Sequence, residues 1–440
     1  INHLSQLSEM KDLKKDSWGV GKNIFSLFQD FILRFLKAPL ENIFSSKNIL
    51  KNHTHIKMDK NIIIIERRLF SSFGHERTQI VALNELTGNK KSIVLTCHGQ
   101  KLKEIPFKNK IYAELPEYDF KNESEETLDY IKKNGDAFAS FIKRNKLNSK
   151  YKIIVPSVRT LEIAMFTYLY KAKKISDSQN VLLRILDLRF LNNLSDSLLN
   201  EFCKFVKLNK IILFSETEEL AKIIWDSFKI RCEGNFILPV TVPFYSNISP
   251  NKIKNHIYIG CLGGSRKSKG FFTIPRIIKS LRIYFKNNDE AFRVTFIVQL
   301  NKDKTKRSFI FKFKEFLSRY ISSSVKVKYI YGIENNIKFF ELLKSVDIFL
   351  LPYSGKAYKY SGSGFITDAT LLEKPLITSQ DMSMGNLLTF NNAISANSPE
   401  EYTAAIIKIS KNYASYSKNS KLAKKNLKKI ILESFKKAIR

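Results

Sequence analysis

Short, fully apolar runs alternate with helical patterns along most of this chain, and this alternation constrains the fold more than any other feature. Within residues 58–240 we expect strands at Ile62–Ile65, Ile93–Thr96, Lys152–Val155, Val181–Leu186, Ile211–Phe214 and Phe236–Leu238. The expected helices between them are His75–Leu86, Glu125–Lys143, Leu161–Lys171, Leu198–Val206 and Glu216–Phe228. Short apolar strands that alternate with helices indicate a parallel sheet covered on both faces. The sequence therefore predicts an α/β fold.

A segment with three prolines, Leu238–Asn251, interrupts this rhythm and is the best candidate for a hinge. After it we expect strands at His256–Gly260, Phe292–Val298, Val325–Ile330, Asp347–Leu351 and Pro375–Ser379. The expected helices are Phe271–Tyr284, Ser308–Tyr320, Ile337–Leu343 and Gly364–Glu373. Two consecutive doubly wound domains place a cleft between the carboxyl ends of their sheets. The predicted organisation is a basic helical extension (1–57), two Rossmann-like domains (58–240 and 241–412) and a basic helical tail (413–440).

Residues 346–379 carry the clearest candidate for a ligand site. A buried strand is followed by a loop rich in Gly, Ser, Tyr and Lys, and a helix is expected to begin near Gly364. A glycine-serine turn that opens a helix presents free N–H groups and the positive end of the helix dipole, which suits phosphate. Asp368 lies one turn into this helix, where a carboxylate can reach sugar hydroxyls. The pattern indicates a nucleotide or nucleotide-sugar site.

A second loop with affinity for phosphate follows the strand at His256–Gly260. Gly263, Gly264 and Ser265 allow close approach of the backbone, and Arg266, Lys267 and Lys269 supply positive charge. The loop matches neither the P-loop pattern nor the GxGxxG fingerprint. A basic surface turn is the alternative interpretation. Two such loops on the same edge of one sheet favour a shared phosphate site.

The first domain offers Gly74, His75 and Glu76, which follow its first strand and open a helix. Ligands approach an open sheet at this end of a βα unit. His75 could bind a substrate hydroxyl, or it could only cap the helix, and the pattern leaves both interpretations open.

The order of these motifs resembles the GT-B glycosyltransferases, in particular the large retaining family that uses nucleotide sugars and includes bacterial polysaccharide and lipid transferases. IIIIERRLFSSFGHE is similar to the first strand and acceptor-side loop of that family, and YIGCLGGSRKSKGF to its diphosphate-binding loop. SGSGFITDATLLEKPLITS resembles its donor-site segment, and the resemblance covers about residues 60–430. It implies two Rossmann-like domains facing a cleft. It also implies transfer of a sugar from a nucleotide diphosphate sugar to an acceptor hydroxyl, with retention of configuration.

The resemblance also implies roles for individual residues. The diphosphate is expected on Gly264, Arg266, Lys269, Ser363 and Gly364. The donor ribose or sugar is expected on Tyr360, Ser361 and Asp368, and the acceptor on Gly74 and His75. His75 and Asp368 are the expected catalytic residues. No metal is required, because the basic loop and the helix that begins at Gly364 can stabilise the leaving diphosphate.

The chain departs from the family in two places. Lys269 and Gly270 fall on a Lys-Gly pair of the family, but the arginine that precedes this pair in the family is missing here, and Arg266 is the expected substitute from a neighbouring position. Of the two family acids, the second falls on Asp368, whereas the first falls on Tyr360 or Ser361. The incomplete pair favours an alternative function, a non-catalytic GT-B subunit that binds a glycan or a partner transferase. A sugar-nucleotide epimerase, or an inverting transferase on the same fold, is a further alternative.

The net charge of +33 allows three interpretations: nucleic-acid binding, an anionic membrane surface, or lysines spread over solvated faces. Nucleic acid is the least favoured, since no recognised module is present. A Phe-rich helix expected at residues 23–36 either packs on its own domain or lies on a membrane surface. The four cysteines show no metal-binding spacing and indicate reduced thiols. We expect a cytoplasmic protein, peripheral on the inner face of the membrane, that acts on a glycan or lipid-linked acceptor.

Overall fold

The computed structural model describes residues 61–69, 75–87, 92–99, 110–117, 128–147, 151–244, 255–301, 324–332 and 336–439. The chain divides into a unit at residues 1–54 and a unit at residues 55–440. All described residues lie in the second unit. The helices expected at residues 23–36 and 308–320 lie outside the described residues.

The first domain is built on a six-stranded parallel sheet with the order β3-β2-β1-β4-β5-β6. Its strands are β1 (Asn61–Ile65), β2 (Ser92–Cys97), β3 (Ile111–Leu115), β4 (Tyr151–Val158), β5 (Val181–Ile185) and β6 (Ile211–Ser215). Successive side chains of a strand point to opposite faces. The four isoleucines of β1 therefore divide between two cores, Ile62 and Ile64 on one face and Ile63 and Ile65 on the other.

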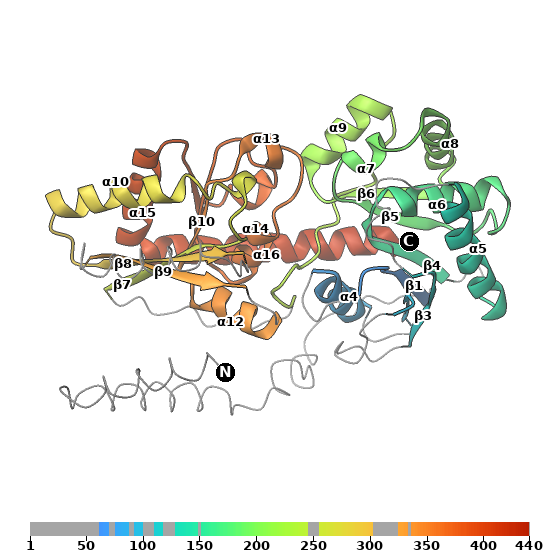
Figure 1. The fold of residues 1–440 in the computed structure, drawn as a ribbon, viewed down its shortest axis with the longest axis horizontal. Helices are drawn as coiled ribbons and strands as arrows, with labels where there is room; N and C mark the ends of the chain where they lie inside the picture. The colour runs from blue at the N-terminus through green and yellow to red at the C-terminus, as the bar shows by residue number, and fades with distance from the viewer. Residues whose placement is uncertain are drawn as a thin grey trace, which may run out of the picture. The chain divides into compact units, whose positions relative to one another are not determined.

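Helices cover both faces of this sheet (Figure 1). They are α4 (His75–Leu86), α5 (Leu128–Arg144), α6 (Thr160–Lys171), α7 (Arg189–Asn192), α8 (Asp196–Lys207) and α9 (Glu218–Phe228). Buried side chains of α5, α6 and α8 pack with Ile63, whereas those of α4 pack with Ile62. The Ser195 side chain accepts a hydrogen bond from the N–H of Leu198 and caps α8. The Thr217 side chain accepts one from the N–H of Leu220 and caps α9 in the same way.

The second domain repeats the same connectivity. Its sheet has the order β12-β11-β10-β7-β8-β9, so that its first strand, β7, is paired with its second and fourth strands, as β1 is in the first domain. The strands are β7 (His256–Cys261), β8 (Arg293–Leu300), β9 (Val325–Tyr331), β10 (Ile348–Leu351), β11 (Leu376–Thr378) and β12 (Ala393–Ser395). All described pairs are parallel. Ligands bind such sheets where the strand order reverses, next to β7 and β10 here.

The helices of the second domain also form two layers. They are α10 (Ile274–Asn287), α12 (Asn336–Ser345), α13 (Gly355–Tyr358), α14 (Gly364–Leu371), α15 (Pro399–Lys411) and the short turns η3 (Lys267–Lys269) and η4 (Gly385–Leu387). In Figure 1, α10 and α15 lie on one side of the sheet and α12 on the other. The core agrees, since Ile348 packs with α10 and α15 whereas Phe349 packs with α12 and α14.

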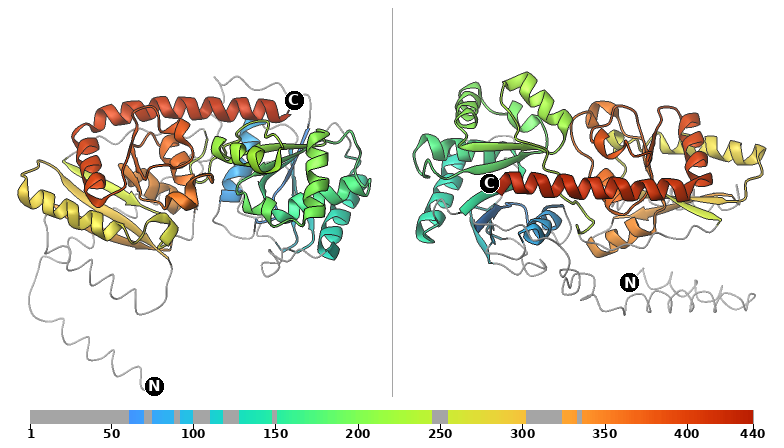
Figure 2. Two further views of the ribbon diagram at one scale, coloured as in Figure 1. Left: turned by 90° about the horizontal axis from the view of Figure 1, so that it is seen from above. Right: turned by 180° about the vertical axis from the view of Figure 1, so that it is seen from behind.

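A long final helix, α16 (Tyr413–Ile439), joins the two domains. Figure 2 shows it as one continuous helix at the end of the chain. Near its C-terminus Phe435 stacks at a tilt on Phe236, with 6.3 Å between ring centroids. Earlier along the helix Lys424 pairs with Glu373 at 2.9 Å. One apolar cluster therefore runs from the α4 face of the first domain, through α16, to the α14 face of the second.

Three expectations about strands need correction. Phe236–Leu238 forms no strand, because only a single bridge, Ser215 to Asn235, links this stretch to the sheet before Pro239 intervenes. Strands β3 and β12 were not expected. Both are edge strands in which most side chains are partly exposed, so neither sequence shows an apolar run.

Candidate active site

The loop after β7 has the backbone geometry that its glycines suggest. Gly263 and Gly264 have φ angles of 107° and 76°, in the region that favours glycine. The Gly263 N–H donates to Gln299 Oε1 at 2.7 Å, and Arg266 Nε donates back to the Gly263 carbonyl at 3.1 Å. Gly270 closes the turn so near to β10 that a methyl group there would lie 1.7 Å from the Pro352 carbonyl oxygen. The loop is thus held against the carboxyl end of β10.

Lys269 is the most unusual side chain of this loop. Its ammonium lies 4.5 Å from the ring centroid of Phe365 and 5.5 Å from that of Tyr353. Among the described residues it forms no ion pair with a carboxylate. Burial, assisted by the charge of Arg266 and opposed by that of Asp368, lowers the pKa of Lys269 to about 7. Such a cation, destabilised beside a glycine turn, is suited to an anionic ligand.

The start of α14 lies beside this lysine. Gly364 and Phe365 open the helix, so their N–H groups have no acceptor within it. The hydroxyls of Ser363 and Tyr353 are buried and close to each other, and neither makes a well-formed hydrogen bond to another group within the described part of the chain. Buried hydroxyls with so few partners are suited to a polar ligand or a water molecule. The structure thus brings Lys269, Ser363 and Gly364 into one place, around Phe365 and Tyr353.

Asp368 has a different environment from the one its position suggests. Its side chain is buried, and Oδ1 accepts hydrogen bonds from the N–H groups of Thr241 at 2.9 Å and Val242 at 3.0 Å. Burial raises its pKa to about 6, against the effect of these two hydrogen bonds. In this structure the carboxylate therefore holds the hinge segment. Its expected role as a ligand of the donor sugar stays a prediction.

The first domain contributes His75, at the start of α4. Its Nε2 lies 3.3 Å from Glu76 Oε1, and its side chain is 38% exposed. Burial lowers the pKa of His75, while Glu76 and, more weakly, Glu216 raise it. The imidazole is accessible and near two carboxylates, as a group that contacts substrate would be. Gly74 lies outside the described residues.

Two polar residues that the sequence analysis missed, Arg184 and Glu216, lie at the carboxyl ends of β5 and β6. Arg184 is fully buried, and its Nη2 donates to Glu216 Oε1 at 2.9 Å. Glu216 lies against Gly362, because a methyl group built on that glycine would be 2.5 Å from Glu216 Oε2. Ligands of open α/β sheets bind at the carboxyl ends of the strands, and Glu216 directly follows β6, so this principle could have pointed to it. In the sequence, however, the SETEEL stretch is typical of the start of a helix.

The loop Tyr360–Ser363 is held by both domains. Thr217 Oγ1 donates to the Tyr360 carbonyl, and Ser383 Oγ donates to the Ser361 carbonyl at 2.6 Å. Glu219 accepts hydrogen bonds from the N–H groups of Met384 and Gly385 at 3.3 and 3.5 Å. The start of α9 thus contacts the loop before α14 and the turn that opens η4.

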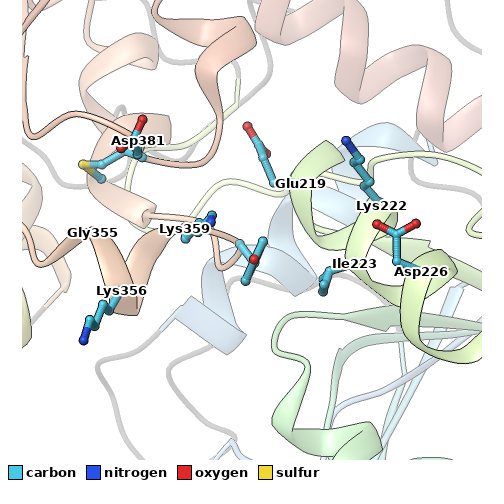
Figure 3. Close-up of a pocket in the computed structure, with 10 residues that line it drawn as sticks. Glu219, Lys222, Ile223, Asp226, Gly355, Lys356, Lys359 and Asp381 are labelled. Carbon is cyan, nitrogen blue, oxygen red and sulfur yellow. The ribbon is translucent and has the colours of Figure 1, made fainter.

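A pocket of about 790 Å³ opens between α9 and the α13 region (Figure 3). Its charged lining is mixed, with Glu219, Lys222 and Asp226 from α9 and Lys356, Lys359 and Asp381 from the second domain. Of the expected site residues, Tyr360 lines this pocket, whereas Lys269, Ser363 and Gly364 do not. The pocket therefore borders the candidate phosphate site but does not contain it.

Comparison with known structures places this arrangement in a class. The chain is similar to a glycosyltransferase from Rickettsia africae, with 12% identity, a TM-score of 0.55 and coverage of 87% of this chain and 96% of that one. Sucrose-phosphate synthase from Thermosynechococcus elongatus is similar at 11% identity and a TM-score of 0.54, with 86% and 98% covered. Anabaena HepE in complex with UDP and glucose is similar at 10% identity and a TM-score of 0.52, with 86% and 99% covered. No protein-family profile matches the chain, and no characterised protein matches its sequence.

At these identities the similarity establishes the fold. The chain has the GT-B fold, with two Rossmann-like domains built on matching six-stranded sheets. The expected fold class is thereby confirmed for the described domains.

Proposed function

We propose that this protein transfers a sugar from a nucleotide diphosphate sugar to the hydroxyl group of an acceptor. The observation that carries the proposal is Lys269, a cation without an ion pair among the described residues, beside two glycines and the first turn of α14. The HepE structure, of the same fold, contains UDP and glucose. The diphosphate is assigned to Gly264, Arg266, Lys269, Ser363 and Gly364, and the ribose or sugar to Tyr360, Ser361 and Asp368.

In the proposed reaction the protein stabilises the charge that develops on the leaving diphosphate. Lys269 and Arg266 supply positive charge, and the N–H groups at the start of α14 supply aligned dipoles. His75, on the acceptor side, contacts the attacking hydroxyl. Retention of configuration follows from the resemblance and is tested by the anomeric configuration of the first product, observed by NMR.

A screen of nucleotides tests the assignment of the donor. A ligand that binds only the folded state raises the melting temperature of the protein. We expect one nucleoside diphosphate and its sugar conjugate to raise it, and Lys269→Met to abolish the shift. If no member of a panel of UDP, ADP, GDP, CDP and TDP with their glucose conjugates shifts the melting temperature, the proposal is wrong.

Transfer is proposed to require no metal ion. Within the described residues no three His, Cys, Asp or Glu side chains gather as a group that could hold one. We expect activity to be unchanged by EDTA, measured as release of nucleoside diphosphate. Activity that disappears with EDTA and returns with Mn²⁺ or Mg²⁺ would show that the cationic loop is not sufficient.

A second candidate function is a non-catalytic GT-B subunit that binds a glycan or a partner transferase. The observation that favours it is the incomplete acidic pair, together with the occupation of Asp368 by the hinge N–H groups. A sugar-nucleotide epimerase is the other alternative. A nucleotide sugar that binds, but is neither hydrolysed nor transferred nor epimerised, would favour the non-catalytic subunit.

The biological setting is proposed on the resemblance alone. It is the synthesis of cell-surface glycans or glycolipids, in the cytoplasm or at the inner face of the membrane, with a glycan or lipid-linked acceptor. No described helix has both the length and the apolar character needed to cross a membrane.

A further inference from the structure

Glu216 presents a rigidly held carboxylate at the boundary between the domains. Arg184, which has no exposed surface, donates to one of its oxygens, Oε1. Nη1 and Nε of Arg184 donate to the carbonyl oxygens of Pro156, at 2.8 Å, and Phe236. A guanidinium anchored through all three of its nitrogens has little freedom to move, and it holds the paired carboxylate in place. Glu216 Oε2 is left without a partner from Arg184.

That second oxygen faces the loop Tyr360–Ser363. A methyl group on Gly362 would lie 2.5 Å from Oε2, so a larger residue there would force the Glu216 carboxylate to shift. The adjacent Thr217 fixes the register, because it donates to the Tyr360 carbonyl. Glu216 is 13% exposed in its side chain, so it retains some access to solvent and ligands.

The loop Tyr360–Ser363 itself contains no carboxylate. The first acid of the expected pair falls on Tyr360 or Ser361, neither of which is acidic. Glu216 places a carboxylate beside Gly362, the next residue of the loop and two residues before the start of α14. A carboxylate repels phosphate and accepts hydrogen bonds from hydroxyl groups. A ligand with its diphosphate at Gly364 would therefore direct hydroxyls, not phosphates, toward Glu216.

We propose that Glu216, supplied by the acceptor-side domain, binds hydroxyl groups of the donor sugar and takes the place of the carboxylate missing from the loop Tyr360–Ser363. The inference rests on the proposed function, since it assumes a diphosphate at the start of α14. Glu216 determines how tightly the sugar part of the donor is held, and Gly362 leaves the space that its carboxylate needs. Arg184 is a positioning residue that fixes the carboxylate.

The test measures binding of a nucleoside diphosphate and of its glucose conjugate by isothermal titration. The pair used is the one of UDP, ADP, GDP, CDP and TDP that raises the melting temperature of the wild type most. In Glu216→Gln we expect the conjugate to bind about tenfold or more weakly, as for loss of one charge-assisted hydrogen bond. The nucleoside diphosphate alone should bind within about twofold of wild type.

Two further variants separate this effect from damage to the fold. Gly362→Ala keeps both charges of the Arg184–Glu216 pair but crowds the Glu216 carboxylate and shifts it, and it should cause the same selective loss. Glu218→Gln removes a charge from the first turn of α9, where Glu218 contacts Asn386 at 3.0 Å. It should alter neither the dissociation constant of the nucleoside diphosphate nor that of its glucose conjugate. It is the matched control.

The possible results separate failure of the role of Glu216 from failure of the proposed sugar transfer. If both constants change equally in Glu216→Gln and Gly362→Ala, or if neither changes, Glu216 does not bind the sugar, although the proposed function stands. If the wild type binds no member of the panel, the proposed function fails and the inference fails with it.

Discussion

Lys269 has the most distinctive surroundings of the residues assigned to the proposed site. Its pKa of about 7 means that part of the population is neutral above pH 7, whereas a diphosphate requires the charged form. Binding should therefore take up a proton, and affinity for the nucleoside diphosphate should fall as the pH rises from 6 to 9. In Lys269→Met we expect affinity at pH 6 to be lower by about 1.5–3 kcal/mol and its dependence on pH to be lost.

The same pKa has a consequence for the free protein. The folded-state pKa of Lys269 lies below that of an unfolded lysine, so its contribution to stability is present above about pH 10 and is lost as the pH falls through 7. Without ligand at pH 6, Lys269→Met should melt no lower than wild type. A large fall in melting temperature would assign the lysine to structure and contradict a role in binding.

Asp368 can be tested by two substitutions with different consequences. Asp368→Ala leaves the N–H groups of Thr241 and Val242 unpaired, so unfolding free energy should fall by about 1–3 kcal/mol. Asp368→Asn keeps an acceptor oxygen and should remain folded. Because burial raises the pKa of Asp368 to about 6, wild-type stability should decline relative to Asp368→Asn as the pH rises from 4 to 6.

The Asn variant also tests the expected contact with the sugar. If the carboxylate binds donor hydroxyls, Asp368→Asn should weaken binding of the nucleotide sugar in isothermal titration. Unchanged affinity in this folded variant would leave Asp368 with a role in the hinge alone.

At the residue scale, the sequence was informative where a side chain acts near its own motif. Lys269 and Gly263 lie in one loop, and their pattern predicts their neighbourhood. The surroundings of Asp368 and Glu216 were harder to predict, because their partners are remote in the sequence. The hinge N–H groups lie about 127 residues before Asp368, and Gly362 lies far along the chain from Glu216. Arg184 is hidden in an apolar strand, where nothing in the sequence marks it as buried with a carboxylate.

At the scale of elements, buried strands were predictable and edge strands were not. The run Ile62–Ile65 packs on both faces and can hardly be anything but a central strand. By contrast, β3 reads IYAEL and has one buried residue, and β12 has none. The pairing of these edges depends on neighbours already in place, which an isolated segment cannot reveal.

Among the elements, α16 should contribute strongly to stability. Phe435 is fully buried and contacts Phe236 of the first domain. Phe435→Ala should lower the free energy of unfolding by about 3–5 kcal/mol, measured by denaturant titration. Leu422→Ala on the same helix, where the side chain is 48% exposed, should change it by less than about 0.5 kcal/mol. Equal effects of the two would mean that α16 does not hold the domains together.

At the scale of the whole molecule, the charge of +33 predicts attraction to anionic surfaces. Each basic residue close to such a surface contributes about 1 kcal/mol, and the attraction weakens as salt is added. We expect the protein to sediment with anionic vesicles at low salt. Because the Phe-rich helix expected at residues 23–36 is the proposed anchor, a variant lacking residues 1–57 should lose this binding.

Two outcomes would overturn this assignment to the N-terminal extension. Failure of the full chain to sediment would exclude membrane attachment. Unchanged binding after the deletion would direct attention to the second domain, where Phe272 and Ile283 are 67% and 53% exposed and the basic residues Arg276 and Lys279 lie between them in the sequence.

The apolar cluster that includes α16 also bears on the order in which the protein is made. Ribosomes deliver the first domain early, but the face of its sheet that carries Ile62 and Phe214 also packs with Phe435, which comes much later in the chain. Until α16 has been made, part of this surface lacks its cover, and exposed apolar surface on a nascent chain invites aggregation or chaperone binding. The first domain thus cannot reach its final packing until the second domain and α16 have been synthesised, although its residues emerge first.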